Sequence, residues 1–174
     1  GVIGTGRIGK AVIQNLSGFG CHIVAHDPYP SEEMKKMGVE YVSLDSLYAQ
    51  SDIVTLHTFL NDETFHMINA ESIRKMKPGV VIINCARGAL IKENELVECL
   101  KDGTLFQAGL DVFEHEPIQE SSRELFNLDN VIMTPHMAAT TEQSVLNCCT
   151  SVANDIVAVC NGQEPKVKAQ KPKF

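Results

Sequence analysis

The N-terminal part of the chain contains a glycine-rich turn that is followed, at a set distance, by an acidic residue. Gly4-Thr5-Gly6-Arg7-Ile8-Gly9 stands between an apolar start and a helical pattern, and a second apolar run ends at Asp27. A strand, a glycine turn, a helix, a second strand and an acid within about thirty residues are typical of one βαβ unit. The pattern predicts a parallel α/β fold that binds a dinucleotide.

Each glycine of this turn has a predicted physical role. Gly4 allows the tight turn, Gly6 lets the backbone approach a pyrophosphate, and Gly9 lets the helix pack closely on the strand. The free N–H groups and the dipole at the start of the helix favour phosphate. Asp27 would accept hydrogen bonds from ribose hydroxyls and repel a 2′-phosphate, which predicts NAD rather than NADP. FAD and S-adenosylmethionine sites share parts of this pattern, so the turn by itself defines a nucleotide fold and not a reaction.

Short apolar runs alternate with helical patterns along the whole chain. The expected strands are Val2–Ile3, His22–His26, Glu40–Val42, Ile53–His57, Val80–Asn84, Gln107–Asp111 and Val131–Thr134. The expected helices are Ile8–Ser17, Ser31–Met37, Leu44–Gln50, Ala70–Lys75, Lys92–Lys101, Ser122–Phe126 and Thr141–Asn161. This alternation predicts a doubly wound, mostly parallel α/β sheet of the Rossmann type with helices on both faces. We expect one NAD-binding domain over residues 1–162, followed by a tail (163–174) that is a disordered end or a truncated return segment.

Net charge, apolar runs and cysteine spacing indicate which partners and which cellular compartment are expected. The net charge of -7 argues against nucleic acid, and no apolar run reaches the length of a membrane span. The six cysteines show neither a C-x-x-C motif nor zinc spacing with histidine, so no metal site is expected. Most of them lie in apolar periodic segments, and we expect buried thiols in a reducing cytoplasm. Cys85 is the exception, because it adjoins the candidate site described next.

Four consecutive expected strands end in residues that can do chemistry. The first ends at His57-Thr58 and the second at Cys85-Ala86-Arg87-Gly88. The third ends at Asp111-Val112-Phe113-Glu114-His115-Glu116-Pro117, and the fourth at Pro135-His136. Ligands of such sheets bind in the crevice beyond the carboxyl ends of the strands. We therefore expect an arginine, acids and a histidine to face one edge of the sheet.

These residue types suit hydride transfer to a 2-keto acid. A histidine can protonate the carbonyl oxygen, since its pKa lies near the working pH. A paired carboxylate orients the ring and stabilises its cation. A guanidinium binds the substrate carboxylate and polarises the carbonyl. The dinucleotide itself carries the hydride.

With the glycine turn and Asp27, three further motifs resemble the D-isomer-specific 2-hydroxyacid dehydrogenase family. They are NxARG (Asn84–Gly88), GLDVFEHEP (Gly109–Pro117) and TPH (Thr134–His136). The segments VSLDSLYAQSDIVTLH and INAESIRKMKPGVVIINCARGAL are especially similar to its D-lactate dehydrogenase branch. The resemblance extends from Gly1 to about Pro165 and covers nearly the whole chain.

The resemblance implies a role for each matching residue. Arg87 binds the substrate carboxylate and carbonyl, Glu116 pairs with the histidine, and His136 is the general acid/base. Asp111 lies near the nicotinamide carboxamide. Arg7 and Ile8 belong to the pyrophosphate turn, and Thr58, Cys85 and Ala86 fall on segments that line the cofactor. His57 and His115 are less well defined by the motifs, and for His115 we expect a solvated or structural role.

The resemblance also implies what surrounds this chain. Family members are close to twice as long and build a substrate domain from segments that this sequence lacks. We therefore expect the cofactor domain of a larger enzyme, most similar to those acting on D-lactate and pyruvate, inactive alone and homodimeric. The run Met137–Thr140 replaces the glycine or aromatic residue of many members, so another substrate (glyoxylate, 3-phosphoglycerate or a branched 2-hydroxy acid) stays open. An NAD-sensing interaction module, as in the corepressors of this superfamily, is the alternative from another functional class.

Overall fold

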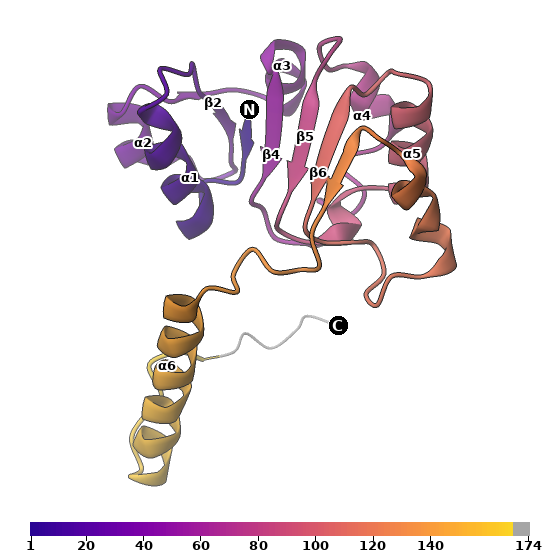
Figure 1. Ribbon diagram of the computed structural model, residues 1–174. Coiled ribbons are helices and arrows are strands. Elements are labelled where there is room, and N and C mark those ends of the chain that lie inside the picture. Colours follow the sequence, from indigo (N-terminus) through magenta and orange to yellow (C-terminus); the bar gives the residue numbers. More distant parts are fainter. Residues whose placement is uncertain (169–174) are drawn as a thin grey trace. The chain divides into compact units, whose positions relative to one another are not determined.

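The computed structural model describes residues 1–168, which form two compact units, Gly1–His136 and the residues from Met137 onward. The first unit holds a seven-stranded sheet in the order β3-β2-β1-β4-β5-β6-β7. Every neighbouring pair of strands is parallel. The strands are β1 (Val2–Ile3), β2 (Val24–His26), β3 (Glu40–Tyr41), β4 (Ile53–Leu56), β5 (Val81–Asn84), β6 (Gln107–Leu110) and β7 (Val131–Met133). The predicted doubly wound fold is confirmed (Figure 1).

β1 and β4 are neighbours in the middle of the sheet, and the direction in which the chain adds strands reverses between them. Val2 pairs with Ala25 of β2 on one side and with Thr55 of β4 on the other. In open parallel sheets, ligands bind beyond the carboxyl ends of the strands at such a switch point. The glycine turn follows β1 directly, so the topology places it in this crevice.

Helices and 3₁₀ turns lie near the predicted places, except for η1, which was not predicted. They are α1 (Arg7–Ser17), α2 (Glu32–Lys36), α3 (Leu44–Gln50), α4 (Ala70–Arg74), η1 (Gly88–Leu90), α5 (Glu93–Lys101), η2 (Glu120–Asn127) and α6 (Glu142–Cys160). The segment expected as a helix over Ser122–Phe126 is 3₁₀. The fully buried Leu125 packs these turns against the core.

Two apolar cores lie on the two faces of the sheet. Successive strand residues point to opposite faces, so Val2 belongs to the core beneath α1 and α2, and Ile3 to the core beneath α3, α4 and α5. The first face is covered only beside β1–β3. Further along it, Ile53 of β4 is 52% exposed and Ile132 of β7 is 76% exposed. Helices therefore lie on both faces, as expected, and within the Gly1–His136 unit those on this face lie beside β1–β3 and leave these residues of β4 and β7 open.

The second unit contains α6, whose first turn is capped by the Thr141 hydroxyl oxygen, which accepts the Ser144 N–H at 3.1 Å. Within this helix no residue is buried. The carboxylate of Asp155, within α6, accepts the N–H groups of Lys166 and Val167 from the segment that follows the helix. The predicted tail reaches beyond residue 168 and lies partly outside the described residues. Among residues 1–168, every helix is too short or too polar to span a bilayer.

The expectation of mostly buried cysteines is wrong. Cys99 on α5 is buried, whereas five cysteines are exposed: Cys21, Cys85, Cys148, Cys149 and Cys160. Three of the exposed thiols lie on α6. Apolar periodicity indicates that a helix has a face to bury, but it does not show that the same unit supplies the surface that covers it.

Candidate active site

The glycine turn has the geometry of a phosphate cradle. Gly4 has φ +91°, and a Cβ there would lie 2.6 Å from the backbone oxygen of His57. A Cβ on Gly9 would lie 2.0 Å from the backbone oxygen of Gly4. At Gly6, by contrast, a Cβ would meet no atom within 4 Å. The fold therefore demands glycine at the first and third positions, while the middle position faces open space that a pyrophosphate can occupy.

The start of α1 is prepared for an anion. Its N-cap residue is Gly6, and no side chain caps the helix. An N-terminus without a side-chain acceptor presents its N–H groups and its positive dipole end to whatever binds above it. Arg7 and Ile8, both exposed, begin the helix here. Their place in a pyrophosphate turn stays a prediction.

Asp27 is held at the end of β2 by three donors. The N–H and the hydroxyl of Thr5 donate to Oδ2 at 2.6 and 3.1 Å, and the N–H of Tyr29 donates to Oδ1 at 2.8 Å. The hydroxyl of Tyr41 donates to Thr5 Oγ1 at 2.9 Å and accepts the N–H of Ser31 at 3.0 Å. Tyr41, on β3, therefore supports Asp27 indirectly, through the Thr5 hydroxyl. No signal in the sequence assigned it this task.

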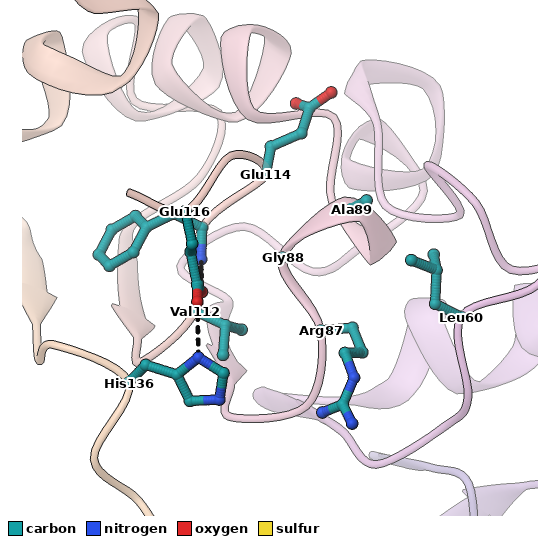
Figure 2. A pocket seen from close by; sticks show the side chains of 9 residues that line it. Leu60, Arg87, Gly88, Ala89, Val112, Glu114, Glu116 and His136 are labelled. Atoms are coloured by element: carbon teal, nitrogen blue, oxygen red, sulfur yellow. Dashed lines mark hydrogen bonds and ion pairs between the residues drawn. The ribbon is translucent and has the colours of Figure 1, made fainter. Parts of the chain in front are cut away.

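At the other strand ends, three predicted residues line one pocket. Arg87 follows β5, Glu116 follows β6 and His136 follows β7, and Figure 2 shows the guanidinium across the pocket from the histidine and its acid. The pocket also contains Leu60, Gly88, Ala89, Val112, Phe113 and Glu114. The predicted convergence of arginine, carboxylate and histidine is thus present in the structure.

His136 and Glu116 form a hydrogen-bonded pair. Nδ1 of the imidazole lies 2.6 Å from Oε2 of the carboxylate, while Oε1 accepts the N–H of Phe113 at 3.0 Å. The hydrogen bond from His136, assisted by the one from Phe113, lowers the pKa of Glu116. A carboxylate at Nδ1 fixes the ring orientation and leaves Nε2 as the nitrogen that can face a substrate.

The turn that carries Arg87 is closely packed against the loop that carries Glu116. The fully buried Asn84 ends β5; its side chain accepts the N–H of Ala86 at 3.0 Å and donates to the backbone oxygen of Arg87 at 2.9 Å. A Cβ at Gly88 would lie 1.8 Å from the backbone oxygen of Phe113. This position requires glycine, which explains the Arg-Gly pair in physical terms.

The remaining predicted residues lie outside this pocket. Asp111 is buried and accepts the hydroxyl of Thr134, and Thr58 and Ala86 are half-buried at the ends of β4 and β5. The loss of part of its solvent contact and the nearby Asp111 raise the pKa of the exposed Cys85 thiol.

The two histidines that the motifs defined less well behave differently. Burial lowers the pKa of His57, whose Nε2 lies 3.0 Å from Oγ1 of Thr55; this suits a neutral structural ring. His115 is exposed, as expected for a solvated side chain.

The parallel sheet and the glycine turn with its acid define a dinucleotide-binding domain. The family model for the D-isomer specific 2-hydroxyacid dehydrogenase, NAD binding domain, matches residues 1–138. The chain belongs to this family and contains its NAD-binding domain.

Known relatives share much of the chain but extend well beyond it. The D-3-phosphoglycerate dehydrogenase of Methanocaldococcus jannaschii is 46% identical over 165 residues, which are 94% of this chain and 31% of that protein. The hydroxypyruvate reductase of Thermotoga maritima is 48% identical over 145 residues, 83% of this chain and 47% of that protein. The crystal structure of D-lactate dehydrogenase with NAD⁺ from Lactobacillus jensenii superposes with a TM-score of 0.91 at 32% identity, covering 98% of this chain and 55% of that one. The chain spans about half the length of these relatives, or less.

Proposed function

We propose that this chain is the cofactor domain of an NAD-dependent oxidoreductase that interconverts a D-2-hydroxy acid and its 2-keto acid. The observation that carries the proposal is the convergence of Arg87, Glu116 and His136 in one pocket, with a carboxylate 2.6 Å from the histidine. General acid/base, positioning acid and anion-binding cation are the three groups that carbonyl reduction of a 2-keto acid requires.

Each residue has a defined task in this proposal. Bound NADH would supply the hydride to the carbonyl carbon. His136 donates the proton on Nε2 to the carbonyl oxygen, while Glu116 holds Nδ1 and stabilises the cationic ring before the proton leaves. Arg87 binds the substrate carboxylate through its planar guanidinium and polarises the carbonyl. In the direction of oxidation, His136 takes the hydroxyl proton back.

The cofactor fits the opposite end of the crevice. Gly6 and the start of α1 would receive the pyrophosphate, and Asp27 the ribose hydroxyls. Both oxygens of Asp27 already accept backbone N–H groups, which orients the carboxylate. A 2′-phosphate would meet this negative charge, so we propose NAD and not NADP.

Pyruvate and D-lactate are our first choice of substrate pair. The structural similarity to D-lactate dehydrogenase with NAD⁺ supports this choice, while the relatives that are named for hydroxypyruvate and 3-phosphoglycerate support other acids. The test is NADH oxidation by the full-length protein with pyruvate, glyoxylate, hydroxypyruvate and 3-phosphohydroxypyruvate. The highest kcat/KM with pyruvate would support the choice, and a higher value with another acid would replace it.

The same panel separates an enzyme from an interaction module that only senses NAD. The module binds NADH without turning over any 2-keto acid, whereas the enzyme oxidises NADH at a measurable rate. The 174-residue chain alone should bind NADH weakly and show almost no turnover. Domain closure normally excludes water and positions the substrate, and one domain cannot supply it.

We also propose a homodimer formed through the cofactor domain. The support is α6, an amphipathic helix in which no residue is buried and apolar side chains such as Leu146, Val152 and Ile156 are more than half exposed. Light scattering on the full-length protein tests this proposal: a dimer mass is expected, and a monomer at micromolar concentration would contradict it.

A further inference from the structure

A second histidine–glutamate pair lies beside the pocket. Nε2 of His66 is 2.8 Å from Oε1 of Glu114, and both side chains are about four-fifths buried, with 21% and 22% exposed. Among the described residues, His66 and His136 are the non-glycine residues with positive φ, both at +52°. Each of these histidines is also hydrogen-bonded to one acid of the segment Glu114-His115-Glu116: His66 to Glu114, and His136 to Glu116.

Glu114 also ties its loop to the start of α5. Its Oε2 accepts the N–H of Glu93 at 3.1 Å, and the buried carboxylate of Glu93 accepts the N–H of Glu114 at 3.0 Å. This reciprocal pair of bonds fixes the backbone of Glu114, two residues before Glu116. Charge-assisted hydrogen bonds to backbone N–H groups are among the stronger ones, so the segment has little freedom to shift.

His66 connects the same acid to the turn that follows Arg87. The N–H of His66 donates to the backbone oxygen of Ala89 at 2.9 Å, and its own backbone oxygen accepts the side chain of Asn69 at 3.0 Å. The ring stacks on Phe65 with centroids 3.8 Å apart. A left-handed backbone at a histidine costs energy and persists where the surroundings hold it. The Glu114 side chain thereby joins its own loop to the His66 loop and to α5, and the backbone of His66 links these segments to η1.

Glu114 lines the pocket but does not point at its reacting groups. Figure 2 shows the carboxylate of Glu116 directed at His136, whereas that of Glu114 is directed away from it. We propose that Glu114, held by His66 and Glu93, is a positioning residue that sets Glu116 against His136 and keeps both in register with Arg87. The kinetic part of this inference rests on the proposed function; the geometric part does not.

The test compares Glu114→Ala with Glu114→Gln in the full-length protein. The glutamine retains an oxygen to accept the Glu93 N–H and an amide to donate to His66 Nε2, so it should keep the geometry while losing the charge. We expect kcat for the preferred 2-keto acid to fall about 10- to 100-fold in the alanine variant and to stay within about threefold in the glutamine variant. The dissociation constant of NADH should be unchanged in both. His115→Ala, on the exposed residue between the two acids, is the matched control and should behave as wild type.

A second readout does not depend on catalysis. Long-range ¹H–¹⁵N NMR on the 174-residue chain reports which nitrogen of neutral His136 carries the proton. We expect the Nδ1–H form in wild type, Glu114→Gln and His115→Ala, and a mixture of both forms in Glu114→Ala. His66→Asn, which tolerates a left-handed backbone, gives a second disruption if the alanine variant does not fold.

The outcomes separate the two proposals. Wild-type kcat and an undisturbed His136 tautomer in both Glu114→Ala and His66→Asn would overturn the positioning role. If the wild-type protein reduces no 2-keto acid while the tautomer responds as expected, the proposed function fails and the positioning role stands.

Discussion

Nδ1 of His136 lies 2.6 Å from Oε2 of Glu116, although the two residues come from the ends of different strands. His136 follows β7 in a left-handed backbone conformation, and Glu116 is held by the N–H of Phe113 in the loop after β6. The pair is partly exposed, with 54% of the histidine side chain and 35% of the acid accessible. The ring is therefore oriented by the protein while remaining open to a substrate.

The Glu116–His136 bond predicts a pH-dependent stability. The pKa of Glu116 is lowered by the hydrogen bond from His136. A carboxyl group with a lowered folded-state pKa contributes stability above its unfolded-state pKa of about 4.3 and loses it as the pH falls through the folded-state value. We expect Glu116→Gln to reduce the free energy of unfolding by less than about 1 kcal/mol near neutral pH, because the pair is exposed.

Denaturant unfolding at a series of pH values measures this effect. The difference between wild type and Glu116→Gln should shrink as the pH falls below about 4. Glu63→Gln, on an exposed loop residue, should show no comparable difference. If the difference in free energy of unfolding between wild type and Glu116→Gln grew as the pH fell, the pKa of Glu116 would not be lowered in the folded state.

Asp27 should determine the choice between NADH and NADPH. Loss of a charged hydrogen-bond acceptor costs roughly 1.5–3 kcal/mol, which corresponds to about 10- to 100-fold in affinity. We therefore expect Asp27→Ala to weaken NADH binding by that factor and to leave NADPH binding unchanged or improved. Fluorescence titration with both cofactors gives the ratio, and melting curves control for the lost contacts to Thr5 and Tyr29. Equal preference for the two cofactors in wild type would refute the argument from charge repulsion.

Tyr41 should act through Asp27. Tyr41→Phe removes the hydroxyl that joins Ser31 to Thr5 and keeps the ring in place. One hydrogen bond of this kind is worth about 1 kcal/mol, so NADH affinity should fall about fivefold. Thr5→Val, which removes the next hydroxyl in the chain, should give a similar loss. If each variant weakens binding and the double variant adds nothing further, the two hydroxyls act as one unit; full additivity would argue against it.

Two glycines of the turn should fail in different ways when changed to alanine. Gly9→Ala places a methyl group 2.0 Å from the Gly4 backbone, which should cost about 1–3 kcal/mol or more of stability. Gly6→Ala meets no atom within 4 Å and keeps an ordinary φ of -68°, so its stability should change by less than about 1 kcal/mol. The added methyl group of Gly6→Ala would occupy the space proposed for the pyrophosphate, so NADH binding should weaken. Thermal unfolding and NADH titration of the two variants should therefore separate loss of fold from loss of cofactor; a stable Gly9→Ala would contradict the packing argument.

Much of the fold follows from short-range patterns that the sequence displays. β-branched runs bounded by glycine and proline mark the strands of the sheet, and their alternation with helices sets the parallel topology. The end of a strand is readable in the same way, so the positions of Arg87, Glu116 and His136 at one edge could be expected before their contacts were known. Local patterns suffice there because parallel strands bring their carboxyl ends together.

Contacts between distant loops could not be predicted in this way. The left-handed backbone of His66 and its bond to Glu114 depend on how four segments meet, and no local pattern indicates it. The same holds for Tyr41, which reads as an ordinary strand residue and yet braces Asp27. The exposure of the α6 cysteines could not be predicted either, because periodicity identifies an apolar helix face but does not show what covers that face.

The most direct test of the central claim is the rate of 2-keto acid reduction by the full-length protein with His136 replaced by alanine. General acid/base groups contribute about 10²- to 10⁴-fold, so kcat/KM should fall by that factor while the NADH dissociation constant stays within about twofold. We expect Glu116→Gln to show a smaller loss of the same kind, since Glu116 acts through the histidine. An unchanged kcat/KM in His136→Ala would contradict the assignment of this pocket as the active site.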